Sequence, residues 1–517
     1  MIGGEAVLRT LVASGVDVVF ANPGTSEMHF VASLDAVPEM HGVLALFEGA
    51  ATGAADGYAR MRDTPAAALL HLGPGLGNGL ANLHNARRAR SPVVVIVGDH
   101  ATYHKPYDAP LESDIDTVAR NVSTWIRRST RPEDAGADAA AAVAAAFGPP
   151  GQVTTLILPA DVSWSDGGSV AAPLERAARA PVRASVLEEA VAALRSGDGV
   201  ALLLGGSALR DAGVRAATRI GNAAGASVLA ETFPARVERG AGVPVIPRLA
   251  YLAEMAAGQL EGFRHLILVD TKSAVSFFAY PGKPSDLVPE GCNVLVLAAG
   301  GDDAVGALEL LATELRAEPD LAVRDAPRPE KPTGELSADS IARAIGALLP
   351  EAAIVSDEAN TSGTFLPSYT AGARRHDWLT LTGGSIGQGL PVALGAAVAC
   401  PDRPVLALEA DGSALYTLQA LWSMAREELD VTTVIFTNRR YAILRMELAR
   451  VGATASGARA LQMLDIAPPD IDFVALARGF GVPATRPETA DGFAADLERA
   501  FAEPGPHLIE AVIPSLF

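Results

Sequence analysis

The chain has 517 residues, of which 49% are hydrophobic and 20% are charged, and its formal net charge is −19. This composition is typical of a globular protein long enough for about three domains of roughly 150 residues each. The acidic balance argues against a nucleic-acid partner, because phosphate backbones are bound by clustered Lys and Arg. The sequence has neither a basic leader nor a charge-free apolar run near the ~18 residues of a membrane span, so we expect a cytoplasmic protein that does not enter a membrane.

Two segments with loop composition divide the chain into thirds. Residues 163–185 lose strand periodicity, and residues 316–339 are rich in proline and charge. We therefore predict domains at 1–170, 185–320 and 335–517. Each third alternates apolar runs with longer Ala-rich helical patterns, and the runs are PVVVIVGD and TTLILPAD, then VALLLGG, HLILVDT and NVLVLAAG, then PVLALEAD and TTVIFTN. This alternation predicts an α/β fold with three doubly wound parallel sheets.

In the first third, two polar residues follow apolar runs at positions where strands are expected to give way to helices. Glu48 lies in LFEGAATG and His71 lies in LLHLGPG. Ligands of parallel α/β sheets gather at such carboxyl ends of strands. His71 could equally be a core histidine, because its neighbours are leucines.

A charge-dense segment, GDHATYHKPYDAPLESDID, follows the next apolar run and contains His100 and His104. Two histidines four residues apart share a metal-binding face only on a helix, and Pro106 and Pro110 favour a loop instead. The sequence leaves two interpretations open for this segment, which are metal binding and lining of a substrate pocket.

The last third contains a βαβ unit with an oxygen-bearing side chain after each strand. The run PVLALEA ends at Asp411, an amphipathic helix pattern over 415–428 follows, and VTTVIFT ends at Asn438. Gly412 and Ser413 would open the helix, where N–H groups and the helix dipole favour anions. The oxygens of Asp411 and Asn438, with a main-chain carbonyl at Arg440, could supply three of the about six ligands of Mg²⁺.

The stretch from ADGS to TNRRY resembles the metal and diphosphate motif of thiamin diphosphate-dependent enzymes, a GDG turn followed by an Asn, which here lies 27 residues after Asp411. The first Gly of that motif is Ala410 in this chain. NPGTSE, LFEGAATGAADGYAR and the glycine-rich stretch from LLHLGPG onward resemble, in the same order, the family's pyrimidine-binding domain. The resemblance covers both outer thirds and is closest to the branch with benzoylformate decarboxylase and acetolactate synthase-like enzymes. It implies a pyrimidine-binding first domain and a diphosphate-binding last domain.

The resemblance also implies roles for individual residues. Glu48 is expected to hydrogen-bond the cofactor's aminopyrimidine ring and drive its tautomer change, and His71 to handle protons of the carbonyl intermediate. Ile386 would lie under the cofactor and hold it bent, while Asn360 and Thr361 could equally cap a loop. The cofactor-binding residues implied are Asn78, Asn360, Thr361, Gly384, Ile386, Asp411, Gly412, Ser413, Asn438, Arg440 and Tyr441, and those implied at the metal are Asp411, Asn438 and Arg440.

Candidate substrate contacts differ in part from those of the relatives. Phe278 aligns with the second catalytic histidine of benzoylformate decarboxylase, which argues against efficient turnover of benzoylformate. Glu447 replaces an aromatic residue of the relatives' pocket, with Arg445 beside it, and favours a polar or anionic substrate group if either faces the cavity. The full set of candidates is Thr25, which stands in place of a serine, His100, Phe278, Ile443 and Glu447.

We interpret the chain as a thiamin diphosphate- and Mg²⁺-dependent enzyme that decarboxylates a 2-oxo acid and can pass the activated aldehyde to a second carbonyl. The resemblance implies a homo-oligomer, a dimer or a tetramer, in which the Glu48 domain of one subunit faces the Asp411 domain of its neighbour. FAD is not expected, because the middle third lacks the longer flavin pattern and Leu111 stands where acetolactate synthases carry a glutamine. Two alternatives are a flavin-free acetolactate synthase-like carboligase and an inactive, cofactor-binding regulatory paralogue.

Overall fold

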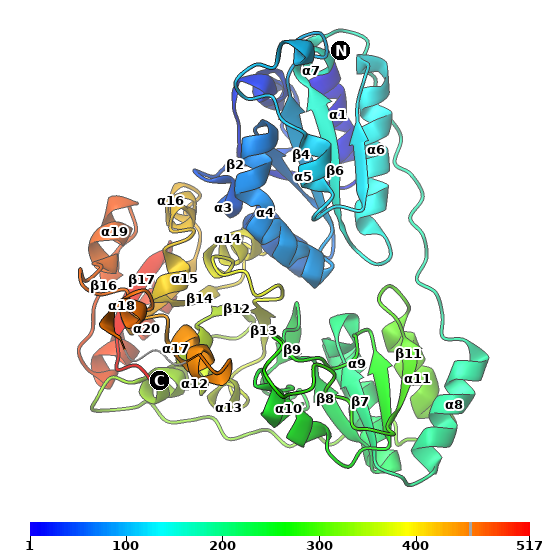
Figure 1. Cartoon of the computed structure of the whole chain (residues 1–517), viewed down its shortest axis with the longest axis vertical. Helices are drawn as coiled ribbons and strands as arrows, with labels where there is room; N and C mark the ends of the chain where they lie inside the picture. Colours follow the sequence, from blue (N-terminus) through cyan, green and yellow to red (C-terminus); the bar gives the residue numbers. More distant parts are fainter. Residues whose placement is uncertain (454–456, 517) are drawn as a thin grey trace.

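Three separate sheets form the frame of the protein in a computed structural model that describes residues 1–453 and 457–516 (Figure 1). The first sheet lies at the top of Figure 1, the second at the lower right and the third at the lower left. An extended stretch runs from α7 (Ala160–Trp164) to α8 (Ala184–Arg195) and connects the first sheet with the second. The α/β architecture with three predominantly parallel sheets agrees with the sequence prediction, while the exact domain boundaries stay a proposal.

The first sheet is wholly parallel, and helices cover both of its faces. Its strand order is β2 (His41–Leu44), β1 (Val18–Asn22), β3 (Ala66–Leu70), β4 (Val93–Asp99), β6 (Val153–Pro159) and β5 (Trp125–Arg128). One face packs on α3 (Glu48–Arg62), α4 (Leu72–Ala89) and α5 (Ile115–Ala119), and the other on α1 (Gly3–Ala13), α2 (Met28–Ala32), α6 (Pro132–Phe147) and α7. Every residue of β4 is buried, as expected for a strand covered on both faces.

The second sheet has four parallel strands in the order β11 (Asn293–Ala298), β10 (His265–Val269), β7 (Val200–Leu204) and β8 (Ser227–Ala230). Its two faces are covered unequally. One packs on α8, α9 (Asp211–Ala224) and α11 (Ala304–Glu314), and the other on α10 (Ala253–Leu260).

The third sheet contains a strand that the sequence analysis did not expect. Its order is β16 (Ala484–Thr485), β17 (His507–Val512), β15 (Val431–Thr437), β14 (Val405–Ala410), β12 (Ala353–Glu358), β13 (His376–Thr380) and β9 (Val237–Arg239). Strand β9 belongs to the predicted middle third and pairs antiparallel with β13, so this sheet is not wholly parallel. Three residues of mixed polarity carry no strand periodicity, and only the remote β13 makes them a strand.

Helices also cover both faces of the third sheet. On one face lie α14 (Gly389–Ala399), α16 (Gln419–Arg426) and α19 (Phe473–Gly479), and on the other α12 (Ala338–Leu348), α13 (Leu366–Tyr369) and α20 (Ala490–Ala502). The predicted helix over 415–428 is shorter in the structure: a separate turn, α15 (Asp411–Ala414), precedes it, and only α16 within it is helical. The turn between them is held by Thr417, whose hydroxyl donates to the Gly387 carbonyl over 3.0 Å.

Helices α3 and α14 join the first and third sheets through a seam of glycines. A Cβ on Gly57 would overlap the carbonyl oxygen of Val392, and a Cβ on Gly395 would overlap that of Ala54. Only glycine permits this approach of the two backbones. The hydrophobic core is accordingly continuous from the strands of the first sheet to those of the third.

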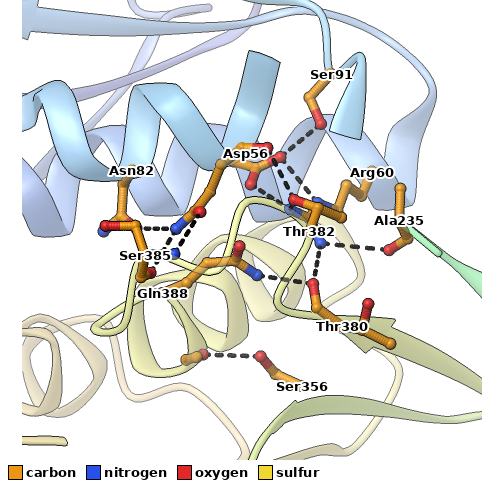
Figure 2. Close-up of polar contacts among 12 residues, drawn as sticks. Asp56, Arg60, Asn82, Ser91, Ala235, Ser356, Thr380, Thr382, Ser385 and Gln388 are labelled. Carbon is orange, nitrogen blue, oxygen red and sulfur yellow. Dashed lines mark hydrogen bonds and ion pairs between the residues drawn. The ribbon is translucent and has the colours of Figure 1, made fainter. Parts of the chain in front are cut away.

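A buried ion pair stands beside this seam (Figure 2). Arg60 donates to both carboxylate oxygens of Asp56, over 2.8 and 2.6 Å, and also to the Thr380 carbonyl over 2.8 Å. Its Nη1 also lies 3.3 Å from the carbonyl of Ala235. Arg60 therefore joins a carboxylate of the first sheet's helix to backbone carbonyls of the middle and last parts of the chain. Separately, among the described residues no helix is long and apolar enough to cross a membrane.

Candidate active site

The structure brings Asp411 and Asn438 to the same edge of the third sheet. Strands β14 and β15 are neighbours, with Ala410 opposite Phe436, and each candidate begins the segment after its strand. Both side chains are buried, with 2% of Asp411 and 7% of Asn438 exposed. Neighbouring parallel strands thus present two oxygen-bearing side chains together.

The backbone around this pair fixes the oxygens. Asp411 accepts hydrogen bonds from the N–H groups of Gly412, over 2.9 Å, and Arg439, over 2.6 Å. The Oδ1 of Asn438 accepts from the Arg440 N–H over 3.0 Å. Burial raises the pKa of Asp411 to about 6, and a cation beside a carboxylate favours its ionised form. A carboxylate and an amide oxygen on adjacent strand ends fit the oxygen preference of Mg²⁺.

The predicted diphosphate side continues from Gly412 to a short helical turn, η5 (Asn360–Gly363). The ring of Tyr441 lies where a Cβ on Gly412 would stand, so only glycine fits there. Asn360 donates to Ser413 Oγ over 2.9 Å and to the Glu358 carbonyl over 3.0 Å, and its φ is +50°. A left-handed, exposed asparagine is a strained position of the kind that clusters at ligand sites. Thr361 follows it and is half-buried.

The glycine-rich loop with Gly384 and Ile386 lies between β13 and α14. Gly384 has a φ of +74°, and a Cβ there would stand 2.5 Å from Cζ of Phe277. Ile386 is half-buried. The N–H groups of Gly387 and Gly389 donate to the buried carboxylate of Glu358, over 2.8 and 2.6 Å. Burial raises the pKa of Glu358 to about 7. Sequence reasoning missed Glu358, because its partners lie some thirty residues away.

The predicted pyrimidine side is built at the starts of α3 and α4. Glu48 is the first residue of α3, is 8% exposed, and accepts a hydrogen bond of 3.0 Å from the exposed Asn78. His71 precedes α4, and its Nδ1 lies 2.8 Å from Oε2 of Glu27. The next residue, Leu72, is buried with a φ of +50°. The His71 ring is therefore fixed at Nδ1 by Glu27, and the buried residue that follows it has a left-handed backbone.

Glu27 is the second residue that sequence reasoning missed. Its carboxylate is 2% exposed, accepts from the Gly24 N–H over 2.7 Å, and leaves Oε1 without a partner in the described structure. Burial raises its pKa, and the neighbouring His71 opposes that shift. Thr25, two residues earlier, is exposed. The sequence shows only an acidic residue at the end of NPGTSE, and nothing in that motif indicates that this residue contacts His71.

The segment with His100 and His104 is a loop with one short helical turn, η3 (Lys105–Tyr107), as its prolines predicted. The two rings lie 5.3 Å apart, and Leu111 in the same loop is exposed. Within residues 1–453 and 457–516, no group of three or more His, Cys, Asp and Glu side chains is arranged to hold a metal ion. The histidine pair therefore gains no support as a metal site.

Three further candidates lie on α17 (Ala442–Arg450) or opposite it. Ile443 is half-buried, Glu447 is 9% exposed, and Phe278 is 52% exposed. Arg445 forms an ion pair with Asp465, with Nη2 and Oδ2 2.6 Å apart. The guanidinium of Arg445 is thus committed to Asp465, and Glu447 is the charged residue of this helix that the structure buries.

The candidates form two groups within one chain. One surrounds Glu48 and His71, and the other surrounds Asp411 and Asn438. Across the described part of the chain, no hydrogen bond or ion pair joins a member of one group to a member of the other.

Comparisons with known proteins match both groups. The family descriptions "Thiamine pyrophosphate enzyme, N-terminal TPP binding domain" and "Thiamine pyrophosphate enzyme, C-terminal TPP binding domain" match residues 1–119 and 362–511. A Mycobacterium tuberculosis H37Rv protein described as "Putative acetolactate synthase large subunit IlvX" is 62% identical over the full length of both chains. The chain belongs to the thiamin diphosphate-dependent enzyme family. It is therefore an enzyme of the group that contains the decarboxylases and acetolactate synthases.

Two further relatives extend over nearly all of this thiamin diphosphate enzyme. Benzoylformate decarboxylase of Pseudomonas aeruginosa is 28% identical over 98% of each chain. The structure of 4-hydroxybenzoylformate decarboxylase from Rhodococcus jostii RHA1 has a TM-score of 0.86, is 25% identical, and covers 99% of each chain.

Proposed function

We propose that this enzyme uses thiamin diphosphate and Mg²⁺ to decarboxylate a 2-oxo acid without oxidation, and that it can transfer the activated aldehyde to a second carbonyl. The observation that carries the proposal is the burial of Asp411 and Asn438 on adjacent strand ends. Such an oxygen pair suits a metal shared with a diphosphate. The family membership makes thiamin diphosphate the diphosphate in question.

Residues of the third sheet would hold the cofactor's charged end. Asp411, Asn438 and the main-chain carbonyl of Arg440 would bind Mg²⁺, and Gly412, Ser413, Asn360, Thr361 and Tyr441 would surround the diphosphate. Gly384 and Ile386 would contact the rings. Bound thiamin diphosphate supplies an electron sink for the electrons that remain when CO₂ leaves.

Residues of the first sheet would move protons. Glu48 would donate a hydrogen bond to the aminopyrimidine ring and exchange its proton there. Because Glu27 occupies Nδ1 of His71, the other ring nitrogen, Nε2, is left to exchange a proton with the substrate. Thr25, His100, Phe278 and Ile443 remain proposed substrate contacts.

The two groups would complete each other across a subunit interface. In a symmetric dimer the Glu48 group of one subunit would face the Asp411 group of its partner, and a tetramer would contain two such dimers. Within the described part of one chain no hydrogen bond or ion pair joins the two groups, and this arrangement would bring them together.

The test is CO₂ release from pyruvate, 2-oxobutanoate, benzoylformate and 4-hydroxybenzoylformate, measured with and without thiamin diphosphate and Mg²⁺. We expect release from at least one substrate that requires both additions. If the cofactor binds but none of the four 2-oxo acids loses CO₂, the result favours the alternative that the protein is an inactive, cofactor-binding regulatory paralogue.

A flavin-free acetolactate synthase-like carboligase is the second candidate, and the description of the 62% identical relative favours it. With pyruvate, that enzyme would release CO₂ and form acetolactate, whereas a simple decarboxylase would form acetaldehyde. We also expect no flavin absorbance in the purified protein. Stoichiometric FAD would instead indicate a flavin-containing acetolactate synthase.

A further inference from the structure

Aromatic residues gather on the side of the second sheet's loops that faces α17, although only 5% of the chain is aromatic. Phe277 lies 5.7 Å from Phe233, 5.4 Å from Tyr251 and 4.8 Å from Phe278, measured between ring centroids. We call these four residues the aromatic cluster. Phe277 and Phe278 remain 41% and 52% exposed, so the cluster offers apolar surface that the chain does not cover.

The aromatic cluster adjoins the proposed cofactor site at two places. Phe277 contacts Gly384 of the glycine-rich loop. The hydroxyl of Tyr251 contacts α17, and that helix begins one residue after Tyr441, whose ring lies against Gly412. A molecule lying on the cluster would therefore lie beside the glycine-rich loop, which is proposed to contact the cofactor rings.

Glu447 presents an unused acceptor to this region. Its Oε1 accepts a hydrogen bond of 3.2 Å from the Tyr251 hydroxyl, but its Oε2 is buried without a partner among the described residues. Burial, and then the Glu447 carboxylate, raise the pKa of Tyr251 and of Tyr280. Buried carboxylate oxygens are normally satisfied, so an unused one points to a ligand.

Arg450, one helical turn later, presents unused donors. Its guanidinium lies 4.5 Å above the Tyr280 ring, its Nη1 is 3.0 Å from Glu254, and its Nε is 3.5 Å from Oε1 of Glu447. Both Nε and Nη2 are buried without a hydrogen bond to any described residue. Packing of the second sheet's loops against α17 accounts for the bonds from Tyr251 to Glu447 and from Arg450 to Glu254. It does not account for the atoms of Glu447 and Arg450 that have no hydrogen bond.

Resting on the proposed function, we propose that Glu447 and Arg450 select 2-oxo acids that carry a neutral hydroxyl at the end of an apolar or aromatic body. A hydroxyl donates one hydrogen bond and accepts two, so one group satisfies both the carboxylate and the guanidinium. A terminal carboxylate would face Glu447, and a terminal ammonium would face Arg450. The apolar body would lie on the aromatic cluster, with the 2-oxo acid end towards the cofactor.

The turnover test compares kcat/KM for 4-hydroxybenzoylformate and benzoylformate, which differ in the hydroxyl alone. We expect the wild type to favour the hydroxylated substrate by at least about 10-fold, since sites built to bond a hydroxyl discriminate against its absence. Glu447→Met should remove the preference, so that its kcat/KM values for the two substrates agree within about 2-fold, whereas Glu447→Gln, which still accepts, should keep part of the preference. No preference in the wild type, or an equal loss on both substrates in Glu447→Met, would overturn the proposal.

A binding test separates this inference from the proposed function. The holoenzyme is titrated calorimetrically with phenylacetate, 4-hydroxyphenylacetate and 4-(aminomethyl)phenylacetate, none of which can lose CO₂ through a 2-oxo group. Tighter binding of the hydroxylated probe, lost in Glu447→Met, supports hydroxyl selection even if no substrate is turned over. Equal binding of phenylacetate, or tightest binding of the cationic probe, refutes it even if CO₂ release establishes decarboxylation.

Discussion

At the scale of single residues, the buried carboxylates carry most of the chemistry proposed for this enzyme. Asp411 follows one strand and Glu48 begins one helix, and both are more than nine-tenths buried. A buried carboxylate is costly unless it is protonated or paired. A single substitution at either residue should therefore change cofactor binding or turnover measurably.

Asp411→Ala should abolish Mg²⁺-dependent binding of thiamin diphosphate. Removal of a carboxylate that contacts the metal leaves the diphosphate charge uncompensated, so we expect binding to weaken by more than about 100-fold. Isothermal calorimetry measures the effect. Asp402→Ala, on the exposed turn before β14, is the matched control and should bind normally. Unchanged affinity in Asp411→Ala would refute the metal assignment.

Glu48→Gln should keep cofactor binding and lose turnover. The diphosphate is anchored by the Asp411 group, while proton transfer by a positioned acid or base contributes about 10²- to 10⁴-fold. We expect a loss of that order in hydrogen–deuterium exchange at the cofactor's C2 and in decarboxylation. Equal exchange rates in the two proteins at full Mg²⁺ saturation would make Glu48 a structural carboxylate.

The sequence predicts some of these positions and not others for a physical reason. Asp411 and Asn438 were predictable as neighbours, because parallel strands in one βαβ unit end at the same edge. Glu27 and Glu358 were not predictable, since each is fixed by a partner that only the tertiary structure brings near. Whether an oxygen of Glu447 has a hydrogen-bond partner depends on how the folded chain packs, and a sequence pattern gives no information about that packing.

At the scale of elements, the glycine seam sets how closely α3 and α14 approach each other. The sequence predicts a helix after Glu48, where α3 begins, but nothing in its pattern predicts contact with α14. Glycines in a helix usually weaken it. Here Gly57 and Gly395 are required by the backbone of the opposite helix.

Gly395→Ala should destabilise the protein by about 1–3 kcal/mol, because its new Cβ would meet the Ala54 backbone, which can yield only by separating α3 from α14. Gly258→Ala is the matched control on α10, where a Cβ meets nothing within 4 Å, and it should stabilise by about 0.4–1 kcal/mol. Thermal unfolding of both variants measures the difference. A Gly395→Ala protein as stable as the wild type would mean that the seam is loose.

His376 on β13 should make stability depend on pH. Burial, and then the nearby Arg239, lower its pKa from 6.5 to about 4, so the unfolded chain takes up a proton that the folded one refuses. The stability present above pH 6.5 is therefore lost as the pH falls towards 4, by about 3 kcal/mol in all.

Chemical denaturation of wild type and His376→Asn across that range measures the effect. The variant should lose less stability on acidification than the wild type. His29→Asn, at an exposed histidine, should behave as the wild type does. Parallel curves for all three proteins would contradict the buried-histidine explanation.

At the scale of the whole molecule, the two groups of site residues define what an oligomer must do. A mixture of Glu48→Gln and Asp411→Ala subunits, co-expressed at equal levels, should recover activity that neither variant has alone. In a hybrid dimer one of the two shared sites contains neither substitution, so the purified hybrid should have about half of the wild-type activity, and a randomly paired equal mixture about a quarter. Activity measured on the purified hybrid tests this, and its absence would place each complete site within one subunit.

Strand β9 also constrains how new enzymes could be assembled from pieces of this one. A chimera that replaces the middle segment at its linkers would carry away the strand that covers β13. The exposed edge would then be a template for pairing with other chains, which is a common origin of insoluble protein. When segments are exchanged between relatives, Val237–Arg239 should therefore be transferred together with the third sheet. The boundaries of an exchangeable segment then follow the hydrogen bonds of the sheet and not the order of the residues.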